Sequence, residues 1–377
     1  MPKVNEFIAD QPLLDVHKRS AGGATELYIT ARPHQAGNTE SQAGALMAAV
    51  AGVLSEHKAA IIQERIFAAP AAMDTLSQAR RGAFNGLCDG VEPTYLCVPA
   101  GDCGPISGIQ VHAVCGCRKP EVVTLDDQAL GRLFTCGGRS YLGGCNIQAD
   151  AAGSPAAQAR EMLEKAEALL ARAGGRLSNV ARTWMWLQDI LDWYGEFNTV
   201  RNELFLSRGL LRADAGGNMP ASTGIGIGPA GRNTCAMDFI AVLGNQRPEF
   251  LLAASKQGAA SKYGSAFSRA AIMPTPAGKT IYVSGTAAID ASGATTHLDD
   301  ARGQIADTLA NVYAVLADAG SGKEDIVQAI VYCKTPQVEQ VFRQEFGDVP
   351  FPHVVAIADV CRSNLLFEVE ATAMSRQ

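Results

Sequence analysis

The sequence predicts an α+β protein built from three βαβαββ repeats, arranged as a covalent pseudo-trimer around a central barrel. The same order of strand-like and helix-like segments occurs three times along the chain. The helical segments carry apolar residues on one face, and stretches rich in glycine, proline and polar residues separate the copies. A single repeat leaves one face of its sheet bare, so the three must stack to bury it.

The third copy is the clearest of the three. A strand over 280–290 precedes a helix that starts near Asp300 and ends at the turn Ala319-Gly320, where glycine commonly follows a helix. The apolar stripe of this helix consists of Ile305, Leu309, Val312, Leu316 and Ala319. The remaining predicted elements are a strand at 325–335, a helix at 338–347 and two strands after Pro352-His353, the last at 367–373.

The other two copies repeat this order. The middle copy has strands at 139–149, 180–190 and 235–242 and helices at 161–173 and 197–209, with Met219-Pro220 before its last part. The first copy has strands at 26–33, 60–69 and 108–114 and a helix at 41–57. We therefore divide the chain into an N-terminal extension (1–24), a degenerate first repeat (25–128), a second repeat (129–245) and a third repeat with its linker (246–377).

Composition limits the classes of function. The chain has 377 residues, of which 47% are hydrophobic, and this is enough to bury a core. It has no apolar run of membrane-spanning length and no apolar region typical of a secretory signal near its N-terminus. The net charge of -6 argues against a nucleic-acid surface. We expect a cytoplasmic protein without a membrane or nucleic-acid partner, either a monomer as a pseudo-trimer or a higher homo-oligomer.

Metal and cofactor sites are not indicated. Seven of the ten cysteines lie between Cys88 and Cys145, but no pair has the CxxC spacing of a metal site; the closest spacing is Cys115-Gly116-Cys117. The six histidines do not pair at metal-ligand spacing. We expect small buried thiols in a reducing compartment, and a redox role of the cysteine-rich stretch stays open.

Superimposing the last strand of each copy places Gln110, Asp238 and Glu368 at one equivalent position. Glu368 belongs to the best-preserved copy. A carboxyl group shielded from water has a raised pKa and holds a proton near neutral pH. The first copy has a neutral amide at this position, followed by His112, and we expect its cleft to be catalytically silent.

The third copy resembles the Rid (YjgF-like, reactive intermediate deaminase) family. The resemblance rests on SGTAA at 284–288, the helix–Ala-Gly turn, Pro352 and the terminal FEVEATA. It implies ligand clefts between neighbouring repeats, since family members are homotrimers with clefts between subunits. Rid enzymes that hydrolyse imines carry an arginine after this proline, whereas His353 stands here. A largely neutral histidine cannot form the bidentate contact of arginine with a carboxylate, so we rank imine hydrolysis lower.

A narrower resemblance to the chorismatase family covers about residues 130–377. It is carried by VARTW (180–184), MPASTGIG (219–226), KYGSAFSRA (262–270) and FEVE (367–370). This resemblance implies hydrolysis of chorismate without a cofactor, releasing pyruvate and either a dihydroxycyclohexadiene carboxylate or a hydroxybenzoate. Opening such an enol ether requires an acid that protonates the methylene carbon, and Glu368 is the candidate.

The substrate carboxylates require guanidinium groups, because arginine presents paired donors in one plane. Arg182 and Arg269 lie inside the family-like strings and are favoured; for Arg182 a structural carboxylate is the alternative partner. Arg201 and Arg208 are seven residues apart on one helix face, and for them surface charge is an equal alternative.

Three further residues lie in loops that could border the cleft. Tyr263 could donate to substrate, or cap the edge of a domain. Gly224 and Gly226, in STGIGIG, could offer backbone N–H groups to a carboxylate. We therefore expect a chorismatase-like hydrolase, with a Rid-type imine or enamine deaminase and a non-catalytic small-molecule-binding protein as alternatives.

Overall fold

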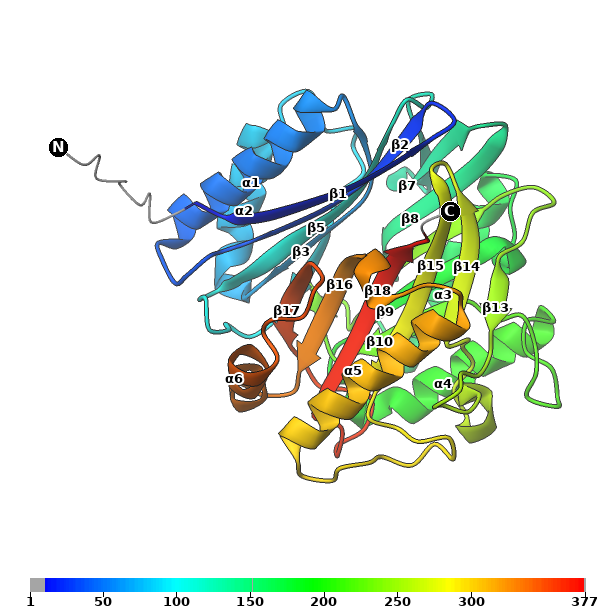
Figure 1. Ribbon diagram of the computed structural model, residues 1–377. Helices are drawn as coiled ribbons and strands as arrows, with labels where there is room; N and C mark the ends of the chain where they lie inside the picture. Colours follow the sequence, from blue (N-terminus) through cyan, green and yellow to red (C-terminus); the bar gives the residue numbers. More distant parts are fainter. Residues whose placement is uncertain (1–10, 151, 376–377) are drawn as a thin grey trace.

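The computed structural model describes residues 11–150 and 152–375, which form three six-stranded mixed sheets with helices on their outer faces (Figure 1). The first sheet has the order β1-β2-β5-β3-β4-β11. Its strands are β1 (Leu13–Ala21), β2 (Ala24–Arg32), β3 (Ala60–Ala68), β4 (Thr94–Cys97), β5 (Ile106–Cys115) and β11 (Gly228–Pro229). Helices α1 (Thr39–Glu56) and α2 (Met73–Ala83) belong to this repeat.

The second and third sheets repeat this arrangement. The second, ordered β10-β9-β12-β8-β7-β6, contains β6 (Glu121–Leu125), β7 (Gln128–Cys136), β8 (Arg139–Ile147), β9 (Val180–Leu187), β10 (Ala221–Ile225) and β12 (Cys235–Val242), with α3 (Pro155–Arg172) and α4 (Ile190–Ser207). The third, ordered β13-β14-β15-β18-β16-β17, contains β13 (Glu249–Leu251), β14 (Ala270–Thr275), β15 (Gly278–Ala287), β16 (Ile326–Cys333), β17 (His353–Ile357) and β18 (Phe367–Met374), with α5 (Ala301–Asp318) and α6 (Pro336–Glu345). The α+β fold of three repeats is thus confirmed.

Capping side chains set the starts of the long helices. Asn38, Ser154 and Asp300 each accept a hydrogen bond from a backbone N–H in the first turn of α1, α3 and α5. Short 3₁₀ turns also occur, at Pro70–Ala72, Leu177–Asn179, Ala260–Tyr263 and Lys323–Asp325. The second and fourth of these precede β9 and β16, so the chain enters both strands in the same way.

The centre of the molecule is a shared core and not the central barrel that we expected. The inner faces of all three sheets contribute to one apolar cluster that includes Phe67, Trp186 and Tyr332. Within the described residues, however, the sheets do not join into one closed hydrogen-bonded barrel. They connect at the edges instead, where β11 pairs with β4 and Ala221 forms a bridge with Ser268. The side chains of the three sheets therefore close the core.

The sheets also differ from the expected repeat boundaries. Strand β1 lies within the segment expected to be an extension, yet it pairs with β2 along its whole length as part of the first sheet. Strand β6 lies within the segment assigned to the first repeat, yet it pairs with β7 of the second. In both cases the reason is the same: the strand forms an antiparallel hairpin with the strand that follows it and so joins that strand's sheet.

The strand register corrects the superposition of the last strands. A bulge interrupts each middle strand, at Ile62 in β3, Ala181 in β9 and Val327 in β16. Three residues beyond each bulge lie Arg65, Trp184 and Ile330, and these pair with Gln110, Asp238 and Glu370. Glu370 is therefore the equivalent of Asp238. Glu368 is equivalent instead to Gly108 and Ala236, which pair two residues farther along. The superposition of Glu368 on Gln110 and Asp238 was therefore wrong by two residues. A shift of two residues leaves side chains on the same face of a strand.

Candidate active site

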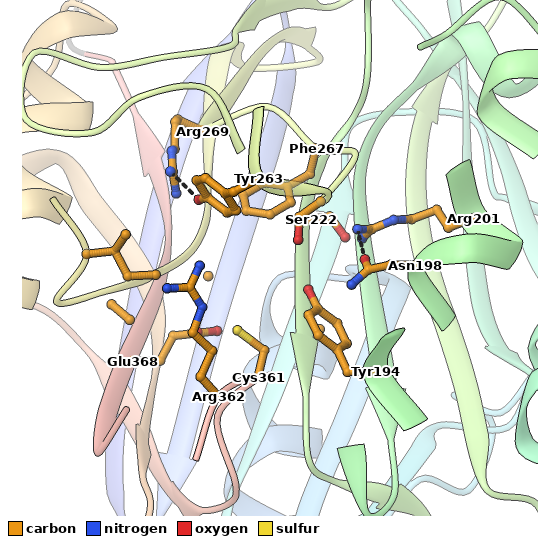
Figure 2. A pocket seen from close by; sticks show the side chains of 15 residues that line it. Tyr194, Asn198, Arg201, Ser222, Tyr263, Phe267, Arg269, Cys361, Arg362 and Glu368 are labelled. Carbon is orange, nitrogen blue, oxygen red and sulfur yellow. Dashed lines mark hydrogen bonds between the residues drawn. The ribbon is translucent and has the colours of Figure 1, made fainter. Parts of the chain in front are cut away.

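A cavity of about 180 Å³ lies between the second and third repeats (Figure 2). The second repeat contributes Tyr194, Asn198, Arg201, Ser222 and Gly224 to its lining. The third contributes Tyr263, Ser265, Phe267, Arg269, Gly285, Ala287, Ile289, Cys361, Arg362 and Glu368. Of the residues predicted for the site, the cavity thus brings together Glu368, Arg269, Tyr263, Arg201 and Gly224, but not Arg182 or Gly226.

Glu368 is the acid of this cavity. It lies near the start of β18, paired with Ala287 of β15 and Tyr332 of β16, and its side chain is 4% exposed. Burial raises the pKa of Glu368 to about 8, and the nearby charge of Glu370 adds to this effect, while Arg182 and Arg269 oppose it. A carboxyl group with this pKa is protonated at neutral pH and can donate its proton.

Gly285 makes room for the Glu368 carboxyl group. A Cβ atom at position 285 would lie 2.2 Å from Oε1 of Glu368 and 3.0 Å from Cγ2 of Thr223. Gly285 also donates its N–H to Oγ1 of Thr223 at 2.9 Å. The glycine in SGTAA is therefore explained by a close approach between β15 and the acid.

Arg182 binds a structural carboxylate. Its guanidinium group donates to Oε2 of Glu370 at 2.9 Å and to the hydroxyl of Thr223. Glu370 also accepts from Trp184 Nε1 at 2.6 Å and from the Tyr332 hydroxyl at 3.1 Å. Arg182 therefore holds the second carboxylate of the FEVE string in place, and does not line the cavity.

Arg201 is a buried cation without a carboxylate partner. It is 1% exposed, donates to Oδ1 of Asn198 at 2.5 Å and leaves its buried Nε without a hydrogen-bond partner. Burial lowers its pKa from the usual value. The surface alternative was therefore wrong for Arg201 and correct for Arg208, which is exposed and pairs with Glu167 at 2.6 Å. A buried guanidinium group that lacks an anion favours an anionic ligand.

Arg269 and Tyr263 form a second polar corner. Arg269 is 2% exposed and donates to the carbonyl oxygen of Gly258 at 2.8 Å and to the Tyr263 hydroxyl at 2.5 Å. Burial raises the pKa of Tyr263. Figure 2 shows Arg269 and Tyr263 together on one side of the cavity, with Arg201 and Asn198 on the other.

Sequence reasoning missed Arg362, Cys361, Tyr194 and Asn198. Arg362 donates to the carbonyl oxygen of Gly293 at 2.7 Å and lies over the Tyr263 ring. Burial raises the pKa of Cys361 to about 12, so its thiol stays protonated. Tyr194 and Asn198 lie on α4, which begins at Ile190, earlier than the helix we expected. The surrounding sequence, WYGEFN, contains no motif that would have identified Tyr194 and Asn198 as site residues.

The charges of the cavity are unbalanced. The three arginines that line it, Arg201, Arg269 and Arg362, donate only to uncharged groups. Among residues 11–150 and 152–375, no carboxylate forms an ion pair with any of them. Since Glu368 is the single acid in the lining and its pKa is raised, the cavity is positively charged at neutral pH. It is suited to a ligand with more than one carboxylate.

The glycine-rich string does not form the carboxylate-binding turn that we expected. Residues Ala221–Ile225 form strand β10, paired in parallel with β9. The N–H of Gly226 donates to the carbonyl oxygen of Asp359 at 2.8 Å, and a Cβ at this position would lie 2.8 Å from that oxygen. Gly226 thus allows its backbone to lie close to that of Asp359, whereas Gly224 lines the cavity.

The positions equivalent to Glu368, Gly108 and Ala236, carry no acid, and those equivalent to Glu370 make structural contacts. Asp238 accepts from Arg65 Nε at 2.7 Å and from Thr94 Oγ1 at 2.6 Å, and Gln110 donates to the carbonyl oxygen of Ala329 at 2.7 Å.

His353 is buried beside the carbonyl oxygen of Phe351, 3.0 Å from Nδ1, and burial lowers its pKa to about 4. His353 is therefore neutral, as the sequence predicted.

Eight cysteines are free thiols, as expected, but of these only Cys145, Cys235 and Cys333 are buried. Cys117 and Cys136 form a disulfide, which the sequence did not predict because their spacing matches no motif. Within the described residues, no group of three or more His, Cys, Asp or Glu side chains could hold a metal ion. In this same part of the chain, no helix is long and apolar enough to cross a membrane.

Comparison with known proteins agrees with this fold. Residues 259–375 match the family model described as Endoribonuclease L-PSP. A crystal structure of chorismatase aligns at 18% identity over 84% of this chain and 93% of that chain, with a TM-score of 0.60. No curated protein sequence matches the chain.

Smaller solved structures align with one repeat. A protein of the Rid family from Yersinia pestis is 22% identical over 33% of this chain and 98% of that chain, with a TM-score of 0.27. A member of the YjgF/YER057c/UK114 family from Mycobacterium tuberculosis is 26% identical over 32% and 98%, with a TM-score of 0.24.

The chain thus joins three repeats of one fold in a single polypeptide. Its particular arrangement is the chorismatase-like fold, and its third repeat matches the L-PSP family model.

Proposed function

We propose that this protein is a chorismatase-like hydrolase that acts on chorismate, or on a related enolpyruvyl cyclic carboxylate, and releases pyruvate. The observation that carries the proposal is the pairing of one protonated acid with three arginines that lack carboxylate partners. Chorismate carries two carboxylates and an enol ether, and these features need two anchors and one proton donor.

The reaction follows from the properties of the acid. Protonated Glu368 donates its proton to the methylene carbon of the enol ether, and the adjacent carbon becomes an oxocarbenium-like cation. Water adds to that carbon, and the resulting hemiketal collapses to pyruvate and the ring alcohol. The Glu368 carboxylate takes up the proton that water releases, which restores the acid. General acid catalysis of this kind contributes about a hundred- to ten-thousand-fold.

The arginines orient the substrate and counter its charge. Arg201 and Arg269 lie on opposite sides of the cavity, so each can bind a different carboxylate. Arg362, beside Tyr263, adds a third donor. Since these side chains are held in place before the substrate arrives, binding costs little side-chain conformational entropy.

A Rid-type imine or enamine deaminase is the second candidate, because the third repeat matches the L-PSP family model. The neutral, buried His353 weighs against it, since an arginine would be needed there. A non-catalytic binding protein is the third candidate.

Incubation of the purified chain with chorismate, followed by a pyruvate assay, separates these candidates. The proposal expects pyruvate from chorismate and no turnover of 2-iminobutyrate. Turnover of 2-iminobutyrate alone would favour the deaminase. Chorismate binding detected by calorimetry, with neither product formed, would favour a binding protein.

A further inference from the structure

A second cavity, of about 460 Å³, lies at the junction of the first and second repeats. It is bordered by the C-terminal end of α1, the loop after α2, the end of β5 and the segment that leads to β6. Its polar and cysteine lining consists of Ser55, Lys58, Cys88, Asp89, Cys115, Cys117, Arg118 and Lys119. It shares no residue with the candidate active site.

Three of the ten cysteines reach this cavity. Cys117 is bonded to Cys136, with a Cα–Cα distance of 5.2 Å, while Cys115 and Cys88 are free thiols. Cys136 does not line the cavity. The disulfide can therefore be approached from this side through Cys117 alone.

Cys115 and Cys117 both line the cavity, and the glycine between them, Gly116, forms a turn. Gly116 has φ +75°, and a Cβ there would lie 2.1 Å from the carbonyl oxygen of Gly23. Only glycine fits this position. The Cys-Gly-Cys spacing is thus tied to a specific backbone conformation, and a free thiol and one sulfur of the disulfide line the same cavity.

The cavity has a positive charge. Lys58, Arg118 and Lys119 line it, and none of the three has an ion pair in the described part of the chain. The single acid, Asp89, is neutralised by Arg132, which donates to both carboxylate oxygens at 2.6 and 2.8 Å. The charge favours an anionic ligand.

We propose that this cavity is a thiol–disulfide exchange site for a low-molecular-weight anionic thiol. The thiolate of that molecule attacks Sγ of Cys117, a new S–S bond forms, the Cys117–Cys136 bond breaks, and Cys136 leaves as a thiolate that takes up a proton. The Cys115 thiolate then attacks Sγ of Cys117, which expels the small thiol and leaves a Cys115–Cys117 disulfide. The sequence of steps isomerises the disulfide without net oxidation.

The test uses the full-length oxidised protein and glutathione, an anionic thiol, with 2-mercaptoethanol as the neutral comparison. After acid quenching and alkylation, peptide mass spectrometry locates each disulfide. We expect a Cys115–Cys117 disulfide in the parent protein. In Cys115→Ser the mixed disulfide at Cys117 should persist, because the second step is blocked.

A variant with Lys58, Arg118 and Lys119 all changed to Ala tests the anion preference. We expect it to react with glutathione about tenfold more slowly, because a positive cavity concentrates an anionic reactant. Its rate with 2-mercaptoethanol should not change. Adducts at Cys136 or Cys88, an intact Cys117–Cys136 bond after treatment, or equal slowing with both thiols would overturn the proposal.

Discussion

Glu368 owes its chemistry to what surrounds it. Burial shields the carboxyl group from water, and Glu370, which accepts hydrogen bonds from Arg182 and Trp184, lies two residues away on the same strand. Both features favour the protonated form. The acid and the network behind it thus form one unit, in which the FEVE string supplies both carboxyl groups.

The raised pKa predicts how activity depends on pH. Glu368 acts as an acid only while protonated, so kcat/KM should be constant below about pH 8 and fall tenfold per pH unit above it. The measurement is a pH–rate profile with circular dichroism at each pH to show that the protein stays folded. A decline that starts near pH 4.5, the value of an ordinary glutamate, would contradict the assignment.

Arg201 and Arg208 form a matched pair on one helix. Arg201→Ala removes a buried cation from the cavity, and we expect KM for chorismate to rise about tenfold to a hundredfold, since a charge-assisted hydrogen bond contributes roughly 1.5–3 kcal/mol. Arg208→Ala removes an exposed cation that pairs with Glu167, and its kinetics should match the parent protein. Equal KM values in both variants would remove Arg201 from the site.

At this scale the sequence identified single residues better than their partners. Glu368, Arg269 and Tyr263 could be proposed because they lie in strings that resemble a known family. The partner of Arg182 could not, since Glu370 is 188 residues away in sequence. The burial of Arg201 without a carboxylate partner could not be predicted either, because the sequence does not show which face of α4 points inward.

Among the elements, β15 and β18 define the position of the acid. Gly285→Ala would place a Cβ 2.2 Å from the Glu368 carboxyl oxygen. Because that oxygen is at the end of a flexible side chain, the acid should move while the fold is kept. We expect kcat to fall at least tenfold with little change in the free energy of unfolding.

The control for this variant is Gly52→Ala in α1, where a Cβ meets no atom within 4 Å. It should keep full activity and gain slightly in stability, because alanine favours a helix over glycine by about 1 kcal/mol. If Gly285→Ala retains parental kcat, the close approach between β15 and the acid is not part of catalysis.

Element order was predictable, but edges and registers were not. The long helices α1 and α5 matched their apolar stripes and caps. The opening strand of each repeat was missed because these edge strands, β1, β6 and β13, show little alternation between buried and exposed residues. The two-residue error in superimposing the last strands leaves every side chain on the same face of its strand, so the alternation of residues could not reveal it.

At the scale of the molecule, related positions between repeats now differ in function. Arg65 pairs with Asp238 across the first and second repeats, while Trp184 and Arg182 bind Glu370 across the second and third. Gln110 completes the set with a neutral contact to the third repeat. These interfaces hold three sheets around a common core, and the cavity between the second and third repeats has Glu368 in its lining.

Asp238→Ala tests the structural role of the first interface. It would leave Arg65 buried without its carboxylate, and we expect the free energy of unfolding to fall by about 3–5 kcal/mol. Urea denaturation measures it, with Asp150→Ala as the control, since Asp150 forms a partly exposed pair with Lys165. A similar small loss in both variants would mean that this ion pair does not hold the repeats together.

The most direct test of the central claim is the rate of pyruvate release from chorismate by the parent protein and by Glu368→Gln, at pH 7. Glutamine keeps the size of the side chain and removes the transferable proton. The structure predicts a fall in kcat of about a hundred- to ten-thousand-fold with chorismate binding retained. Equal rates for the two proteins would contradict the assignment of Glu368 as the acid.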